Sequence, residues 1–261
     1  MDGTVRVDGG EITTITLDRP DRGNALSTSM LETFFDALGS VAGTETRCIV
    51  LRGEGKHFCA GADVGDVASS AAGGARYGLG FERLLRTIEE HPIPVVARVH
   101  GAALGAGCQL LAACDLSVAA TDAQIGIPSA KLGLLLDLEK IQRMVRVIGV
   151  AHSRELLLAG RSITGTRAAS WGLVTLAVDA GDLDDAVAEL ARSVAAGAPF
   201  SVRGSKAALR SILDYGALTR EVDGEIFALH DAAAGEALAS EDIREGMAAL
   251  RERRDPRFSG K

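Results

Sequence analysis

Apolar and polar residues alternate at the start of the chain, in residues 5–7 and again in residues 12–17. Residues 8–10, which include two glycines, separate these stretches, and glycine supplies the positive φ that a tight turn requires. The pattern therefore predicts a β-hairpin. Beyond it, apolar residues recur at i, i+3 and i+4, and Ser27 precedes them. We expect Ser27 to cap a helix that ends near Leu38.

The middle of the chain alternates between strand and helix patterns. Short apolar runs predict strands at residues 48–52, 95–99, 116–120 and 173–178, and apolar residues at helical spacing predict helices at residues 106–113, 141–150 and 153–158. Such alternation is typical of an α/β fold with a parallel sheet. Residues 65–80 interrupt it with Gly, Ala and Ser. We expect a mobile loop near a binding site there.

The last third of the chain has almost only helical patterns, beginning at Leu183 and interrupted at Ala198 and Pro199. This change predicts two parts. A core spans residues 1–195, and a helical C-terminal region spans residues 196–261.

Composition and charge exclude several classes of protein. The 261 residues are 47% hydrophobic, enough to bury a core without metals or disulfides, and the formal net charge of −7 argues against a nucleic-acid-binding face. We expect no signal peptide, and the apolar runs are too short for membrane insertion. The four cysteines form no CxxC pair and no metal-ligand spacing. We therefore expect a cytoplasmic protein with reduced thiols and no metal site.

Three stretches carry the most specific signal: FCAGAD at residues 58–63, HGAALGAGCQL followed by CDL within residues 100–116, and AQIGIP at residues 123–128. Shorter matches lie at residues 19–20, 24–26, 92–97 and 245–247. In order and separation, these stretches resemble the crotonase (enoyl-CoA hydratase/isomerase) superfamily over nearly the whole chain. The resemblance implies an α/β fold of the crotonase type, a ββα spiral in which residues 196–261 form the trimerisation region. It also implies a homotrimer or a dimer of trimers.

The resemblance places an oxyanion hole at Ala62 and Ala106, whose backbone N–H groups would bind the oxygen of an acyl-coenzyme A thioester. Such chemistry needs donors that are held by a rigid backbone and aimed at the oxygen where charge develops. Ala106 also begins the predicted helix 106–113, where free N–H groups and the helix dipole favour negative charge.

Coenzyme A is the ligand or substrate that the resemblance implies, and no permanently bound cofactor is expected. By resemblance its binding positions are Arg22, Lys56, Ala60, Asp63, Val64, Gly105 and Arg253. The main chain around Ala60, Asp63 and Val64 would face the adenine. Lys56 and Arg22 would approach ribose or phosphate groups.

The chain departs from a hydratase at both acid–base positions. Family members that hydrate 2-enoyl thioesters use two glutamates, and the matching residues here are Gln109 and Ser129. An amide does not exchange a proton near neutral pH, and a hydroxyl needs a base of its own. Ordinary hydration is therefore not expected.

One carboxylate stands near the position where some family members, such as dienoyl-CoA isomerases, carry a catalytic aspartate. Asp137 follows a leucine-rich run and is followed closely by Glu139. Asp137 could serve as an acid or base in a raised-pKa environment, or it could cap a helix that begins near residue 138. The sequence leaves both roles open.

Two functions therefore remain, and whether the chain is an enzyme stays undecided at this point. One is an acyl-CoA-binding protein of fatty-acid metabolism that keeps the oxyanion hole without the glutamates. The other is a hydratase/isomerase-type enzyme, of the lyase or isomerase class, that uses Asp137 or Glu139.

Overall fold

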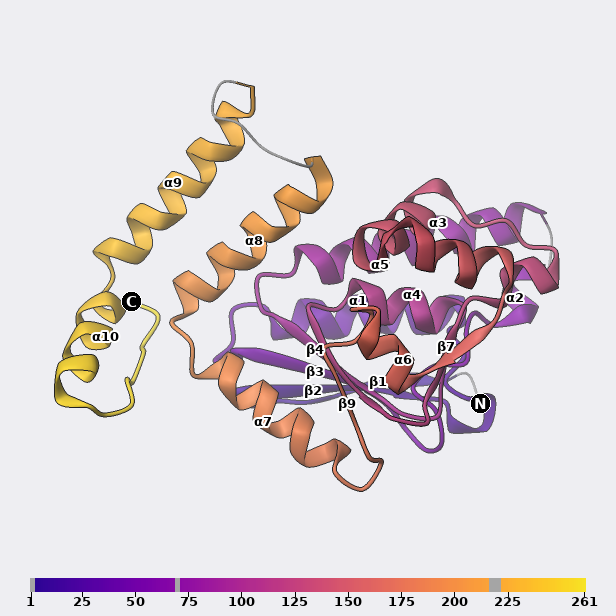
Figure 1. The fold of residues 1–261 in the computed structure, drawn as a ribbon, viewed down its shortest axis with the longest axis horizontal. Coiled ribbons are helices and arrows are strands. Elements are labelled where there is room, and N and C mark those ends of the chain that lie inside the picture. The colour runs from indigo at the N-terminus through magenta and orange to yellow at the C-terminus, as the bar shows by residue number, and fades with distance from the viewer. Residues whose placement is uncertain (1–2, 69–70, 216–221) are drawn as a thin grey trace.

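The computed structural model of the protein describes residues 3–68, 71–215 and 222–261. Its main sheet has six strands in the order β1-β2-β3-β4-β6-β9 (Figure 1). Their bounds are β1 Thr4–Asp8, β2 Ile12–Asp18, β3 Cys48–Gly53, β4 Val95–Val99, β6 Leu116–Ala120 and β9 Leu176–Val178. β1 pairs antiparallel with β2, which confirms the predicted hairpin. The other neighbouring strands of this sheet run parallel to each other.

A second, smaller sheet consists of β5 (Ala102–Leu104), β7 (Gln124–Gly126) and β8 (Ser162–Thr164), in that order. β5 and β7 run parallel, and β7 and β8 run antiparallel. Strands of three residues are too short to show an alternating pattern, so the sequence did not predict this sheet.

Helices surround the main sheet. Their bounds are α1 Thr28–Val41, α2 Val64–Ala68, α3 Ala71–Glu90, α4 Ala106–Ala113, α5 Leu138–Leu158, α6 Gly165–Ser170, α7 Leu183–Ala195, α8 Pro199–Tyr215, α9 Gly224–Ala239 and α10 Glu241–Glu252, and two 3₁₀ turns are η1 Pro20–Arg22 and η2 Pro128–Leu132. In Figure 1, α7 lies below the sheet, and α1, α3, α4 and α5 lie above it. This layering confirms the predicted α/β class.

Several local predictions are confirmed. The Ser27 hydroxyl accepts a hydrogen bond from the Met30 N–H at 3.3 Å, so Ser27 caps α1 as expected. α4 and β6 begin and end at the predicted residues. Their apolar residues are buried, as the periodicity requires.

Two expectations are wrong, and a third differs in detail. Residues 65–80 belong to α2 and α3 rather than to a loop, except for residues 69–70, which lie outside the described residues. The strand predicted at 173–178 is only Leu176–Val178. The two helices predicted at 141–150 and 153–158 are present as the two parts of α5, which meet at a kink at Gly149, where φ is 70°.

The last three helices leave the core. Figure 1 shows α8, α9 and α10 extending from the main body, with the C-terminus near α10. Large apolar side chains on these helices are exposed: Leu209, Ile212, Leu213, Leu229, Leu238, Met247 and Leu250. The division at residue 195 stays a prediction, because no boundary has been measured.

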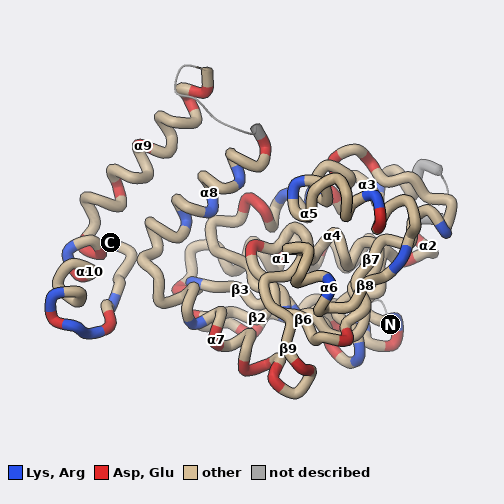
Figure 2. The backbone as a smooth tube through the Cα atoms, viewed as in Figure 1, with Lys and Arg blue, Asp and Glu red and all other residues tan. Residues whose placement is uncertain are grey.

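Charged residues of both signs are interspersed along the chain (Figure 2). Among the described residues, no helix is long and apolar enough to cross a membrane.

Candidate functional site

Two of the motif stretches lie side by side. Cys59 and Ala103 form a parallel bridge, the Cys59 N–H donates to the Ala102 carbonyl at 3.0 Å, and the Leu104 N–H donates to the Cys59 carbonyl at 3.0 Å. The first turn of α4 packs on the same carbonyl. A Cβ at position 107 would lie 2.1 Å from it, so only Gly107 permits this approach.

The backbone turns at the next residues bring two N–H groups together. Gly61 has φ +130° and Gly105 has φ +53°, conformations that residues with a side chain rarely adopt. A Cβ on Gly105 would lie 3.9 Å from the Gly61 Cα. Ala62 and Ala106 directly follow these glycines, so both predicted donors lie in one place.

Neither of these N–H groups has a hydrogen-bond acceptor among the described residues. The Ala106 N–H belongs to the first turn of α4, where N–H groups have no acceptor within the helix and where the positive end of the helix dipole lies. Both alanines are partly exposed rather than sealed. The pair can therefore receive an oxygen atom that carries negative charge.

A loop before α1 holds the first stretch in place. Asn24 is fully buried with φ 57°, and its amide donates to the carbonyls of Glu54 and His57 at 2.8 and 2.7 Å. The Ala60 N–H donates to the Gly23 carbonyl at 2.8 Å. These bonds fix the backbone that presents Ala62.

Asp63 is engaged within the protein. Its carboxylate pairs with the Arg19 guanidinium at 2.5 Å and accepts the Gly65 N–H at 2.8 Å, and its own N–H donates to the Leu26 carbonyl. The hydrogen bond from Arg19 holds the pKa of Asp63 below its usual value. The Asp63 side chain thus anchors the loop and is not free to contact a ligand.

Other residues predicted to contact coenzyme A form an exposed rim beside Ala62. Arg22, Lys56 and Ala60 are exposed, and Val64 is 73% exposed. The Arg22 charge is close enough to Asp63 to lower its pKa. Gly105 is partly exposed and its N–H donates to the Gly126 carbonyl at 2.8 Å.

Arg253 is not part of this rim within one chain. It ends α10 in the left-handed conformation, and Figure 1 shows α10 at the opposite end of the molecule from α2. Only a second copy could bring this residue to the site.

The two positions that the resemblance matches to the hydratase glutamates have different environments. Gln109 lies on α4 one turn after Ala106, is 1% exposed, and neither its Oε1 nor its Nε2 atom has a partner among the described residues. Ser129 lies in η2 and is partly exposed, and its carbonyl accepts the Leu134 N–H at 2.9 Å.

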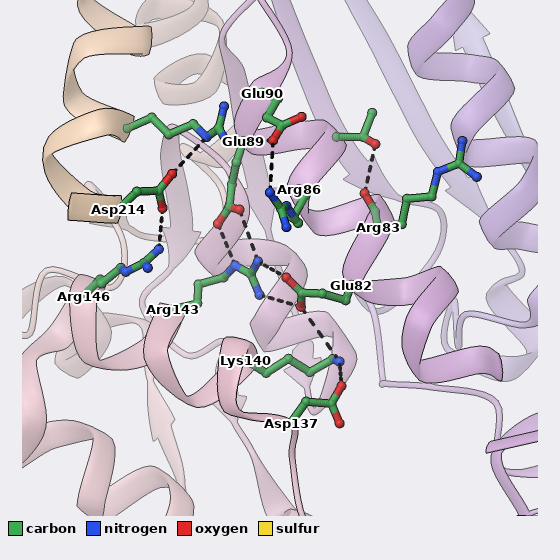
Figure 3. A network of polar contacts seen from close by, with 12 residues as sticks. Glu82, Arg83, Arg86, Glu89, Glu90, Asp137, Lys140, Arg143, Arg146 and Asp214 are labelled. Carbon is green, nitrogen blue, oxygen red and sulfur yellow. Dashed lines mark hydrogen bonds and ion pairs between the residues drawn. The ribbon is translucent and has the colours of Figure 1, made fainter. Parts of the chain in front are cut away.

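Asp137 occupies the N-cap position of α5, but its side chain makes no capping hydrogen bond. Its carboxylate pairs with the Lys140 ammonium (Figure 3). Lys140 is 6% exposed and also approaches Glu82 at 3.9 Å. The structure therefore places Asp137 at the start of the helix, with its charge matched by a buried cation. Glu139 is exposed.

That pair continues into a larger ionic network between α3 and α5. Arg143 binds Glu82 at 2.7 Å and Glu89 at 2.6 Å, and is 5% exposed (Figure 3). Ionic groups at such low exposure need partners of this kind, because an unpaired buried charge is strongly destabilising. The network joins the helices that cover α4.

Two aromatic residues of α3 were not predicted as a pair. Phe81 is 2% exposed and stacks on Tyr77 with ring centroids 6.1 Å apart. The Tyr77 hydroxyl is buried and has no partner among the described residues. The apolar spacing on α3 could have revealed them, but the Gly-rich start of this segment suggested a loop.

The histidine side chains hydrogen-bond to the backbone. His57 accepts the Ala102 N–H at 3.1 Å, His100 bonds the Gly55 carbonyl at 2.8 Å, and His91 bonds the carbonyls of Ile93 and Leu38. These contacts fix loops and strand ends near the site.

The cysteines are free thiols. Burial raises the pKa of Cys48, Cys59 and Cys108 to about 12, which keeps them protonated and unreactive at neutral pH. Within the part of the chain that is described, no three His, Cys, Asp or Glu side chains gather as metal ligands.

Comparison with known proteins gives one consistent result. The family model for enoyl-CoA hydratase/isomerase matches residues 8–261. A protein of Mycobacterium tuberculosis named "Probable enoyl-CoA hydratase echA6" is 34% identical over 249 residues, covering 95% of this chain and 96% of that protein. A peroxisomal Δ(3,5)-Δ(2,4)-dienoyl-CoA isomerase of Arabidopsis thaliana is 33% identical, and the match covers 94% of this chain and 91% of that protein.

Solved structures agree with the sequence comparison. An enoyl-CoA hydratase/carnithine racemase from Magnetospirillum magneticum superimposes with a TM-score of 0.90 at 30% identity, covering 99% of this chain and 96% of that one. The shared fold includes both sheets and the C-terminal helices.

Proposed function

Because the chain belongs to the enoyl-CoA hydratase/isomerase (crotonase) family, we propose that it binds acyl-CoA thioesters and hydrates enoyl-CoA slowly or not at all. The main support is the pair of N–H groups at Ala62 and Ala106, which lack acceptors and lie where Gly61 and Gly105 meet. A thioester oxygen placed between them accepts two hydrogen bonds from a fixed backbone.

The nucleotide end of the ligand then lies over the exposed rim. Arg22 and Lys56 supply positive charge for ribose or phosphate groups, and the exposed backbone near Ala60 and Val64 leaves room for the adenine. The Asp63 carboxylate acts indirectly in this arrangement, since it holds Arg19 and the loop that carries Arg22.

The missing carboxylates support binding rather than hydration. The Gln109 amide cannot act as a general acid or base near neutral pH, and the Ser129 hydroxyl needs a base of its own. A single general acid or base contributes about 10²–10⁴ in rate, so the loss of both leaves hydration very slow. Coenzyme A thioesters are therefore ligands here, and no permanently bound cofactor is required.

The alternative, an enzyme that uses Asp137 or Glu139, has less support. The Asp137 carboxylate is paired with Lys140, and Glu139 is exposed. In this structure the Lys140 ammonium occupies one of the two carboxylate oxygens of Asp137. We therefore favour a binding role in fatty-acid metabolism.

We also propose a homotrimer or a dimer of trimers. Its support is the row of exposed apolar side chains on α8, α9 and α10, which a monomer would leave in water. In such an assembly, Arg253 of one copy could approach the rim of another.

Titration calorimetry with short and long acyl-CoA and enoyl-CoA thioesters, together with mass spectrometry for turnover, tests the proposal. We expect binding without hydration, and much weaker binding of free fatty acids of equal length. Rapid hydration of an enoyl-CoA, or equal affinity for the free acid, would contradict it.

A single proline substitution, with a matched control in another helix, tests the Ala106 N–H as the oxyanion donor. Ala106→Pro removes the α4 N–H at the first helical residue, a position that tolerates proline. Leu138→Pro makes the same change at the first residue of α5, where Leu138 is 74% exposed. Both variants should fold, and only Ala106→Pro should lose acyl-CoA affinity. Unchanged affinity in Ala106→Pro would rule out this donor.

A further inference from the structure

Two histidines stand where the two motif stretches begin. His57 comes directly before Phe58, His100 is the first residue of the second stretch, and both side chains are partly buried. The Phe58 N–H donates to the His100 carbonyl at 2.9 Å, so the two stretches lie against each other at this point. The groups that the two imidazole rings bind therefore affect how the stretches are held together.

Each ring contacts the backbone of the other stretch. The His57 Nδ1 atom accepts the Ala102 N–H at 3.1 Å, and the His100 Nε2 atom bonds the carbonyl of Gly55, just before the first stretch, at 2.8 Å. The fit is close, because a Cβ on Gly101 would lie 2.6 Å from the His57 Nδ1 atom. We refer to these two crossed contacts of His57 and His100 as the histidine clasp.

The partners of the rings fix their protonation state. A backbone N–H can only donate, so the His57 Nδ1 atom carries no proton when it accepts the Ala102 N–H. The His100 Nδ1 atom lies 2.9 Å from a guanidinium nitrogen of Arg98, which also can only donate. The proton of His100 is therefore on Nε2, where it is donated to the Gly55 carbonyl. The histidine clasp requires both rings to be neutral.

The surroundings of His100 oppose a positive charge on its ring. The groups that face it are Arg52 of β3, Arg98 of β4, His57, and Asp184 of α7. The Asp184 carboxylate is already paired with Arg98 at 2.5 Å. Burial, together with the charges of Arg98 and Arg52, holds the pKa of His100 below its ordinary value. Protonation of His100 adds a positive charge beside two arginines.

The His57 ring has a more exposed charged environment. A Cβ on Gly23 would lie 3.4 Å from the His57 Cδ2 atom, so the end of η1, which carries Asp21 and Arg22, packs against the ring. Lys56 is its neighbour in the chain, and all three charged residues are exposed. One negative and two positive charges give a proton on His57 no net attraction.

We propose that the histidine clasp positions the two oxyanion donors and is pH-sensitive: protonation of His57 and His100 opens it, and acyl-CoA affinity falls as the solution becomes acidic. This inference rests on the proposed function. A protonated Nδ1 atom turns a proton toward a partner that can only donate, so the hydrogen bond is lost. Ala102 begins β5, the strand that leads to Ala106, so a shift at the clasp changes how the two donors are aligned.

The direction of the pH dependence follows from the neutral state of the rings. A histidine in the unfolded chain has a pKa of about 6.5, and the pKa of His100 is lower in the folded protein. The contribution of the clasp is therefore complete above about pH 6.5 and is lost as the pH falls through the folded value.

Calorimetry with butyryl-CoA at about pH 7.5 and about pH 5.5 tests the clasp. In His57→Asn with His100→Asn, the amide oxygens can accept hydrogen bonds in place of Nδ1 without titrating. The ratio of the two affinities should be about tenfold larger for the unmodified protein than for this double variant. His230→Asn makes the same substitution at an exposed residue of α9 and should keep the ratio of the unmodified protein. The phosphates of coenzyme A titrate alike with all three proteins, so comparison of the ratios removes their effect.

Nuclear magnetic resonance of the histidine ring nitrogens in the unmodified protein gives a readout that needs no variant. At about pH 7.5 both rings should carry their proton on Nε2 and none on Nδ1. Because protonation and ligand binding affect each other reciprocally, bound butyryl-CoA should move the midpoint of the His100 titration to lower pH. A purely structural role for the ring would leave this midpoint unchanged.

The outcomes separate this proposal from the proposed function. Equal affinity ratios in the unmodified protein and the double variant would overturn the clasp while leaving acyl-CoA binding intact. A proton on Nδ1 of either ring at about pH 7.5 would overturn it as well. Absence of butyryl-CoA binding at both pH values would overturn the proposed function and its regulation together.

Discussion

The carbonyl oxygen of Cys59 lies where a side chain on Gly107 would have to begin, at 2.1 Å from the Cβ position. This contact joins the first turn of α4 to the stretch that presents Ala62. The alignment of the two proposed donors therefore depends on the absence of a side chain at position 107.

Gly107→Ala should separate the two stretches. Overpacking at a buried backbone contact costs about 1–3 kcal/mol, and we expect at least this loss in the free energy of unfolding, together with weaker acyl-CoA binding. Denaturant unfolding and calorimetry measure the two effects. Gly39→Ala is the matched control, because Gly39 is exposed within α1 with open space around its Cβ position. It should stabilise by about 0.5–1 kcal/mol. Equal stability of the two variants would show that the contact is not required.

The ion pair between Asp63 and Arg19 should make stability depend on acid pH. The pKa of Asp63 is lowered in the folded protein, so the pair stabilises fully above the unfolded pKa of about 4 and loses its effect as pH falls through the folded value. The difference in melting temperature between the unmodified protein and Asp63→Asn should be largest at pH 7 and shrink below about pH 4. A difference that does not change between pH 7 and pH 2 would contradict the assignment.

Restoring both glutamates should restore some hydration. Gln109→Glu with Ser129→Glu places an acid–base pair beside donors that are already present. Hydration of crotonyl-CoA should rise measurably above the unmodified protein, and each single variant should gain much less than the pair, because the two groups act as a unit. The rate of crotonyl-CoA loss by ultraviolet absorbance provides the measurement. If the unmodified protein is already as fast as the double variant, another residue supplies the chemistry.

The helices α8–α10 should mediate self-association. Leu238 and Leu250 are 71% and 75% exposed on α9 and α10, and a charge at both positions would be buried in any interface formed there. Leu238→Glu with Leu250→Glu should shift the protein toward the monomer in analytical ultracentrifugation. Leu79→Glu on α3, where Leu79 is 76% exposed, should not. If the unmodified protein is monomeric at micromolar concentration, the proposed self-association is wrong.

The sequence predicts an element well when the apolar pattern of that element matches the burial of its residues in the structure. α4 and β6 have a clear apolar pattern and are buried where the pattern requires. The start of α3 is different. Its Gly and Ala residues have weak local preference, and the helix is specified by the burial of Tyr77 and Phe81 further along.

Some features of the candidate site could likewise be predicted from the sequence, and others could not. Motif matching predicted Ala62 and Ala106 as donors, and the close approach of Gly61 and Gly105 explains why these two residues lie together. The partner of Asp137 was not predictable, because the buried state of Lys140 depends on Glu82 from another helix. The unsatisfied state of Gln109 could not be predicted either, since it depends on which side chains surround it in three dimensions.

The burial of Gln109 and Tyr77 has a kinetic consequence. Their polar atoms have almost no solvent-accessible surface, so we expect that a ligand reaches them only after the groups around them have moved. Opening of the protein, rather than diffusional encounter, then limits association, and the observed rate levels off as ligand concentration rises. Dissociation requires the same opening. We therefore expect each complex to be long-lived.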